Sequence, residues 1–408
     1  MNDGEMTQEL SGQRSAWFAV SLVFLAGVAA ALQVGKAPVA LPLLRQELDL
    51  TLVAAGWIVA IFSLLAGIGG LFSGMTVDRF GYRRTLTGGL ALIVAASAWG
   101  ASSQGFSQLL ASRLIEGVGF LLVSTSGPRI ISILVSGAQQ RMAMGIWSAY
   151  MPVGVSLMLL SGPMLLGSWG WRGLWWGNSI LVGAVLVAVL AVLPPGRPGT
   201  RSGGGLGDLR VVVTSPGPLL LAACFAGFTF QHLALIGFLP TLLIDQYGHS
   251  TARAAELTAL VMLANAGGGV SAGWLLGRGV SRAGLIAGAS VCLAVAAWGL
   301  VNENIAGSIR FLCAVAISGV GGLIPGAVIA GITVHSPGPQ RVGSVTGLVV
   351  QGSQLGQFAG PAVVSWLVAW SGDWQFGAWA MIAAAMLTAM LAIPLGWLEH
   401  RLGARQEA

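Results

Sequence analysis

The sequence predicts an all-helical integral membrane protein with twelve transmembrane helices, arranged as two pseudo-symmetric halves of six. Three observations lead to this prediction: long apolar runs, a low content of charged residues and an internal repeat. Of the 408 residues, only 8% are Asp, Glu, Lys or Arg, whereas a soluble globular protein carries about 25%. So few charges cannot cover the surface of a soluble protein of this length, and we expect the chain to lie in a lipid bilayer.

A helix that crosses a bilayer needs about 20 mostly apolar residues, and twelve runs of the chain meet this need. The first six cover residues 17–40, 52–74, 85–103, 108–130, 143–167 and 173–194. The second six cover residues 217–240, 252–276, 283–302, 307–333, 343–369 and 375–397. The runs are too long for membrane strands and do not alternate in polarity, so we expect helices.

The longest polar stretch, residues 195–216, divides these runs six plus six and is rich in Gly and Pro. It predicts a flexible cytoplasmic loop between an N-terminal half, residues 1–194, and a C-terminal half, residues 217–408. With both termini inside, only Arg45, Arg172 and Arg253 fall on the outer side. Basic residues favour cytoplasmic loops. We therefore expect a multi-pass protein of a bacterial-type inner membrane, with cytoplasmic N- and C-termini.

The two halves repeat each other at an offset near 200 residues. Arg113 in the fourth run precedes Pro128 by fifteen residues, and Arg310 in the tenth run precedes Pro325 by the same spacing. Transporters are commonly built from such repeats, with the substrate site between them.

The segment after the second run reads GMTVDRFGYRR, from Gly74 to Arg84. It resembles the G-x-x-x-D-R-x-G-x-R-R signature of the major facilitator superfamily and lies in the same loop, between helices 2 and 3. The fourth run contains RLIEGVG, which resembles the helix 4 motif of that superfamily. The resemblance covers essentially the whole chain and implies the major facilitator fold and secondary active transport by alternating access. Within the superfamily, QVGKAPVALPLLRQEL in the first run resembles the cyanate permease and nitroimidazole transporter group.

The resemblance also implies that the signature residues form a latch, which closes the cytoplasmic side in the outward-open state and breaks on switching. The latch residues are Gly74, Asp78, Arg79, Gly81, Arg83, Arg84 and Arg129. The glycines allow close helix approach and a tight turn. Asp78 can accept hydrogen bonds at a helix N-terminus, where the dipole favours negative charge, or pair with Arg129. The alternative for Arg83 and Arg84 is that they only set the membrane orientation.

Basic residues inside the predicted spans indicate the substrate. A charge there costs about 2.5–3.5 kcal/mol and tends to face a cavity. Lys36, Arg113 and Arg310 qualify, and Arg310 has no acid near it in sequence. The resemblance implies that helices 1, 4, 7 and 10 line the central cavity, where His232 joins these three. Because Glu116 is the one acid clearly inside the spans, we expect an excess of positive charge that binds a small organic or inorganic anion.

Gln33 and Gln231 complete the predicted substrate-binding set, although both can instead bridge helices. Other members of the set also have structural alternatives. Lys36 can extend to the outer interface, Arg113 can simply pair with the acid three residues later, and His232 can pack between helices.

A proton carrier within the membrane needs a carboxyl or an imidazole, which makes Glu116 and His232 the candidates. The sequence therefore predicts proton symport of an anion. Anion exchange without a proton is one alternative, and proton-driven efflux of drugs or metabolites is another. Four histidines and no paired carboxylates argue against a membrane enzyme. We expect no cofactor, no metal and no nucleic-acid partner, and one chain that functions as a monomer because it holds both halves.

Overall fold

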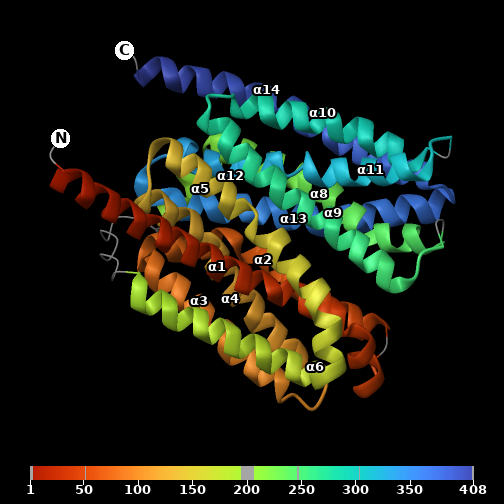
Figure 1. The fold of residues 1–408 in the computed structure, drawn as a ribbon. Helices are drawn as coiled ribbons and strands as arrows, with labels where there is room; N and C mark the ends of the chain where they lie inside the picture. Colours follow the sequence, from red (N-terminus) through yellow and green to blue (C-terminus); the bar gives the residue numbers. More distant parts are fainter. Residues whose placement is uncertain (1–2, 51, 194–205, 246–247, 303, 407–408) are drawn as a thin grey trace.

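The structure is a computed structural model that describes residues 3–50, 52–193, 206–245, 248–302 and 304–406. These residues form a bundle of long helices, and none of them lies in a strand. Figure 1 shows α1, α3, α4 and α6 in the lower part of the bundle and α8 to α14 in the upper part. Both termini lie at the same end of the bundle, which we call the terminal end.

The N-terminal half contains α1 (Asp3–Glu47), α2 (Leu52–Phe80), α3 (Tyr82–Ala101), α4 (Phe106–Leu134), α5 (Gly137–Ser148) and α6 (Tyr150–Val192). After α7 (Leu206–Thr214), the C-terminal half contains α8 (Pro216–Asp245), α9 (Thr251–Gly277), α10 (Arg282–Val301), α11 (Gly307–Gly319), α12 (Leu323–His335), the short 3-10 helix η1 (Pro339–Arg341), α13 (Val342–Ser371) and α14 (Trp374–Gln406). The all-helical fold class is confirmed, and eight segments of the described chain are long and apolar enough to cross a membrane.

Three predicted boundaries differ from the observed helices. The fifth run begins in α5 and continues in α6. The sixth run also lies in α6, which turns at Gly170, where a φ of 64° suits a residue without a side chain. The tenth run is interrupted, because α11 ends at Gly319 and α12 begins at Leu323. The Gly-Val-Gly-Gly sequence at this break has low helix propensity.

The predicted loop 195–216 is partly helical. Residues 194–205, including Arg197 and Arg201, lie outside the described residues. Leu206–Thr214 form α7, so the prediction of a continuous loop is wrong for this part. Val212 of α7 is fully buried and belongs to the main apolar core, which gives this short helix a packing partner that the loop composition does not reveal.

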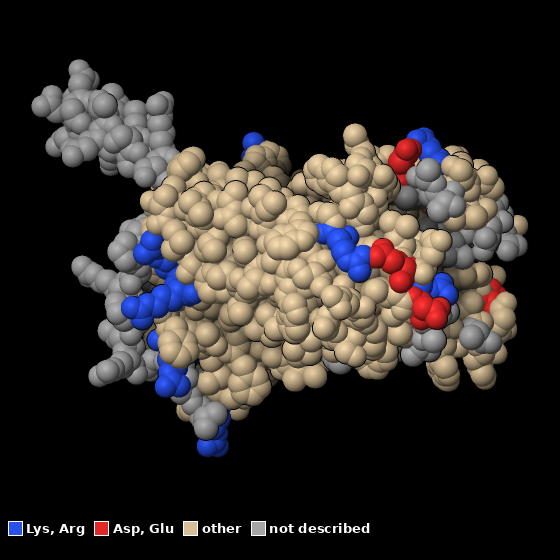
Figure 2. All heavy atoms as spheres, turned by 90° about the horizontal axis from the view of Figure 1, so that it is seen from below, with Lys and Arg blue, Asp and Glu red and all other residues tan. Residues whose placement is uncertain are grey.

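Charge is distributed unevenly along the bundle. On the face shown in Figure 2, Lys and Arg side chains lie at the terminal end without acidic neighbours, whereas toward the opposite end Asp and Glu side chains lie beside further Lys and Arg side chains. Between them lies a broad uncharged surface, as expected for the part of a membrane protein that faces lipid.

A buried ionic cluster joins three helices of the C-terminal half. Arg282 of α10 pairs with Glu399 of α14, and its Nε also donates to Ala327 O of α12 at 3.0 Å. The Nε2 atom of His335, at the end of α12, lies 2.8 Å from the same Glu399 oxygen. Arg282 is only 7% exposed, so Glu399 balances a charge that water cannot reach.

We predict that Glu399→Gln destabilises the protein by about 3 kcal/mol, because it leaves a buried guanidinium without its carboxylate. Thermal unfolding in detergent measures the loss. The matched control is Glu256→Gln, which breaks an exposed pair with Arg253 (3.0 Å) and should cost less than about 1 kcal/mol. Equal losses in the two variants would contradict a structural role for the buried cluster.

Candidate functional site

A cavity of about 560 Å³ lies between the two halves of the bundle. It is lined by α1, α2, α4, α5 and α6 from the N-terminal half and by α8, α9, α12 and α13 from the C-terminal half. Most lining side chains are apolar. In the part of the chain that the structure describes, no three His, Cys, Asp or Glu gather closely enough to hold a metal ion. A mostly apolar cavity of this volume has the character of a small-molecule site.

The N-terminal half supplies an aromatic wall. The ring centroids of Phe62 and Phe120 lie 5.1 Å apart, those of Phe120 and Tyr150 lie 6.4 Å apart, and those of Tyr150 and Trp147 lie 4.6 Å apart. All four residues line the cavity. The guanidinium carbon of Arg113 lies 4.8 Å from the centroid of the Phe62 ring, so this wall combines aromatic surface with one cation.

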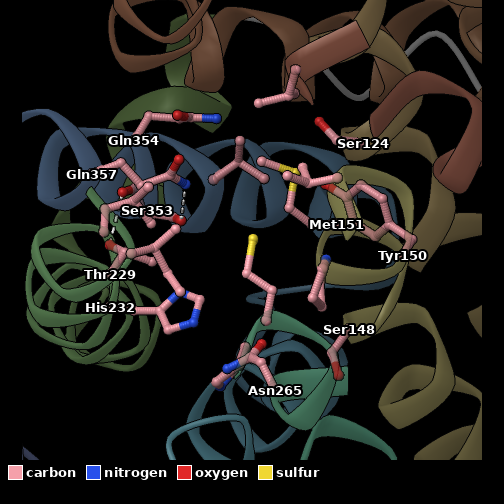
Figure 3. Close-up of a pocket in the computed structure, with 18 of the residues that line it drawn as sticks. Ser124, Ser148, Tyr150, Met151, Thr229, His232, Asn265, Ser353, Gln354 and Gln357 are labelled. Carbon is pink, nitrogen blue, oxygen red and sulfur yellow. Dashed lines mark hydrogen bonds between the residues drawn. The ribbon is translucent and has the colours of Figure 1, made fainter. Parts of the chain in front are cut away.

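The C-terminal half supplies an uncharged polar wall (Figure 3). Its members are Thr229 and His232 of α8, Asn265 of α9, and Ser353, Gln354 and Gln357 of α13. Several of them are bound to one another or to neighbouring helices. Thr229 Oγ1 donates to Ser353 O at 2.8 Å, and Gln357 Nε2 donates to Ser353 Oγ at 3.2 Å.

Arg113 belongs to a buried ionic triad behind the aromatic wall. Its Nη1 lies 2.5 Å from Glu116 Oε2, and Lys36 Nζ lies 2.6 Å from Glu116 Oε1. Lys36 also donates to Ser97 Oγ at 2.7 Å, and Arg113 Nη1 donates to Gln33 O at 2.9 Å. One carboxylate thus serves two cations that are almost completely buried. With all three groups ionised, the triad has a formal charge of +1.

Two of the six predicted substrate-binding residues line the cavity, namely Arg113 and His232. His232 Nε2 lies 2.9 Å from Ser318 Oγ, and its ring stacks on Phe228 with centroids 5.2 Å apart. Lys36 is fully buried behind the cavity rather than extended to an interface. It reaches the cavity wall only through Glu116, the acid that it shares with Arg113.

The other three predicted residues contact neighbouring backbone or side chains away from the cavity. Gln33 Nε2 donates to Asn178 Oδ1 at 3.2 Å, and Gln231 Nε2 donates to Gly227 O of its own helix. Arg310 Nε donates to Leu300 O of α10 at 2.7 Å. None of the three lines the cavity in this conformation. The expected convergence of Lys36, Arg113 and Arg310 is therefore replaced by a triad within the N-terminal half.

The predicted latch residue Asp78 joins the two halves at the terminal end. Its carboxylate accepts hydrogen bonds from Gly343 N at 2.9 Å, Ser344 N at 2.7 Å and Ser344 Oγ at 2.6 Å. Burial raises the pKa of Asp78 to about 6, although these donors and the charge of Arg129 lower it. The carboxyl faces the N-terminus of α13, where the helix dipole favours negative charge.

The neighbouring glycine permits this contact, because a Cβ at Gly74 would collide with the backbone of Gly343. Gly81 turns the chain between α2 and α3 with a φ of 88°. The arginines of the signature make other contacts. Arg83 Nη2 donates to Leu190 O within the same half, at 2.8 Å, and Arg79 lies over the ring of Phe80. Arg84 is exposed, and Arg129 is half-buried.

Comparison with known proteins identifies the family. The model of the Major Facilitator Superfamily matches residues 23–361, which is most of the chain. The chain belongs to the major facilitator superfamily. Proteins of this family are membrane transporters rather than enzymes, which agrees with the signature. The proton:xylose symporter XylE shares the fold, with a TM-score of 0.76, 18% identity, and 92% of this chain and 95% of that chain covered.

Two curated relatives align with a large part of this transporter. The multidrug efflux protein YfmO of Bacillus subtilis is 28% identical over 247 residues, which are 60% of each chain. The 3-(3-hydroxy-phenyl)propionate transporter of Escherichia coli is 26% identical over 267 residues, which are 64% of each chain. The match thus spans less than two thirds of the length of either relative.

Sequence reasoning missed most of the polar wall. Gln351, Gln354 and Gln357 repeat at intervals of three within an otherwise apolar run. This spacing keeps amides near one face of a helix and could have marked α13 as a cavity helix. The Lys36–Glu116 pair had no such signal, because 80 residues separate its members.

In the structure the two halves are joined at the terminal end. We predict that Asp78→Asn lowers the equilibrium ratio of joined to separated protein about ten-fold, because the variant loses charge-assisted hydrogen bonds to α13. Spin labels at the terminal ends of α2 and α13 measure the change as a larger population of long distances. Arg79→Gln is the matched control and should leave the distances unchanged, since Arg79 lies over Phe80 of its own helix. Identical distance distributions in wild type and Asp78→Asn would refute a role for Asp78 in joining the halves.

Proposed function

We propose that this transporter carries an amphipathic organic anion, with an apolar body and one carboxylate, coupled to a proton. The observation that carries this proposal is the composition of the cavity. Among its described lining residues, Arg113 is the one member of the Asp, Glu, Lys and Arg group. The rest of the wall is aromatic, aliphatic or uncharged. An apolar substrate body suits these walls, and a carboxylate suits the guanidinium.

The triad supplies a physical basis for proton coupling. With Glu116 ionised, Lys36 and Arg113 share one carboxylate, and the formal charge is +1. If Glu116 takes up a proton, the charge rises to +2 and Arg113 loses its ionic partner. A substrate carboxylate then binds Arg113 more tightly. By linkage, the bound anion favours protonation of Glu116 to the same extent, so proton and anion bind cooperatively.

His232 is the second candidate for a proton carrier, since it lines the cavity on the opposite half. We further propose that Asp78 and the start of α13 act as the latch of the alternating-access cycle.

The proposed location is a bacterial-type inner membrane, with cytoplasmic termini and a functional monomer. The clustering of basic side chains at the terminal end supports this orientation. Membership of the cyanate permease and nitroimidazole transporter group stays a prediction.

The names of the two relatives favour different substrates. A transporter of 3-(3-hydroxy-phenyl)propionate handles an aromatic acid, which agrees with an aromatic wall beside Arg113. A multidrug efflux protein is the other relative. The mainly apolar cavity also suits neutral lipophilic compounds, so proton-driven efflux of drugs or metabolites is the second candidate function.

We predict that purified protein in liposomes accumulates a radiolabelled arylalkanoic acid when a pH gradient is imposed. Arg113→Gln should weaken apparent affinity about ten- to hundred-fold, because a charge-assisted hydrogen bond is lost. Glu116→Gln should still exchange the acid across the membrane but should not concentrate it, since residue 116 no longer releases a proton.

The matched control for these variants is Arg253→Gln, which removes an exposed arginine outside the cavity and should leave transport unchanged. Two results would overturn the proposal. One is transport of lipophilic cations or neutral drugs with no movement of organic acids. The other is accumulation of the acid by Glu116→Gln when a pH gradient is imposed, which would show that a residue other than Glu116 carries the proton.

A further inference from the structure

One buried acceptor among the described cavity-lining residues has no hydrogen-bond partner. Gln354 of α13 lines the cavity, and its side chain is only 4% exposed. Its Oε1 atom is buried and accepts no hydrogen bond from any described residue. A buried acceptor without a donor is unfavourable. The ligand of a binding cavity is a natural source of the missing donor.

The neighbours of Gln354 are already committed to other contacts. Ser353 O accepts from Thr229 Oγ1, and Ser353 Oγ accepts from Gln357 Nε2. Asn265 Nδ2 donates to Ser318 O at 2.9 Å, the same residue whose hydroxyl contacts His232. The wall is therefore organised around internal bonds, and Gln354 is left with an unmet acceptor (Figure 3).

This acceptor lies on the half of the molecule opposite the cation. Gln354 belongs to α13 of the C-terminal half, whereas Arg113 belongs to α4 of the N-terminal half. The Cβ of Gln354 lies 3.7 Å from the position of a Cβ built at Gly67 of α2, so the residue sits where the halves meet. A ligand that contacts both residues bridges the two halves, which is the arrangement that an alternating-access site requires.

We propose that Gln354 determines substrate specificity by accepting a hydrogen bond from a hydroxyl or N–H group on the substrate. Together with the proposed function, on which this inference rests for the anionic group, it names a substrate class: hydroxylated aromatic acids. The carboxylate contacts Arg113, the ring packs on the aromatic wall, and the hydroxyl donates to Gln354 Oε1. An acid without this hydroxyl leaves the amide oxygen unpaired and binds more weakly.

The test uses four probes and two variants. The probes are 4-phenylbutanoic acid, 4-(4-hydroxyphenyl)butanoic acid and the methyl esters of both. Binding to the full-length protein in detergent is measured by calorimetry. The wild type should bind each hydroxylated probe about ten-fold more tightly than its partner without the hydroxyl. Gln354→Met keeps the length of the side chain but removes the acceptor. In this variant the affinity ratio of hydroxylated to non-hydroxylated probe should fall to about one.

Gln351→Met is the matched control. Gln351 lies one turn earlier on α13 and also has a buried Oε1 without a described partner, but it does not line the cavity. The same substitution there should preserve the ten-fold preference. A wild-type ratio of one would overturn the proposal even if a variant fails to fold, and so would a ratio that survives in Gln354→Met.

The esters separate this inference from the proposed function. Equal binding of acids and esters, with the hydroxyl preference intact, would reject the anionic substrate and still support the role of Gln354. Stronger binding of the acids than of the esters, with no preference for the hydroxyl, would support the anionic substrate and reject the role of Gln354. Failure of all four probes to bind would overturn both.

Discussion

The exclusion of water from the centre of the N-terminal half constrains everything around it. An uncompensated charge in a low-dielectric interior is costly, and Lys36, Arg113 and Glu116 reduce this cost by pairing with one another. The triad ties α1 to α4, while the backbone oxygens of Gln33 and Ile58 accept further hydrogen bonds from Arg113. Arg113 is held against the aromatic wall as a result, so the same contacts that stabilise the half also present one cation to the cavity.

The cavity is made by the meeting of two unlike surfaces. The N-terminal half contributes a continuous set of rings beside a charge, and the C-terminal half contributes uncharged hydroxyls and amides among apolar side chains such as Phe225 and Phe228. Neither surface alone encloses a ligand. Any molecule that fills the space therefore contacts both halves and senses their relative position, which links binding to conformation in the proposed transport cycle.

Closure at the terminal end depends on backbone contact. Gly74 brings α2 close enough to α13 for Asp78 to accept hydrogen bonds from the first residues of that helix. Gln140 of α5 and Thr333 of α12 add a second bond between the halves, at 3.0 Å. The same helices also pack closely, because Gly70 of α2 meets the backbone of Gly347 of α13 and Gly145 of α5 meets that of Gly273 of α9. Opening this end therefore requires both the polar bonds and the glycine contacts to separate.

The order of residues is enough to predict the fold. A bilayer demands long apolar helices, so run length and charge content lead to twelve spans, and the Gly74–Arg84 signature leads to the family and to Asp78. The contacts that these residues make could not be predicted from the sequence. Lys36 and Glu116 are distant in sequence, Asp78 meets Gly343 in the other half, and Arg310 donates to Leu300 rather than facing the cavity. Hydrophobicity is a local property of a segment, whereas a binding site depends on which helix faces meet. Only tertiary packing therefore decides that Arg113 and Gln354 line one cavity.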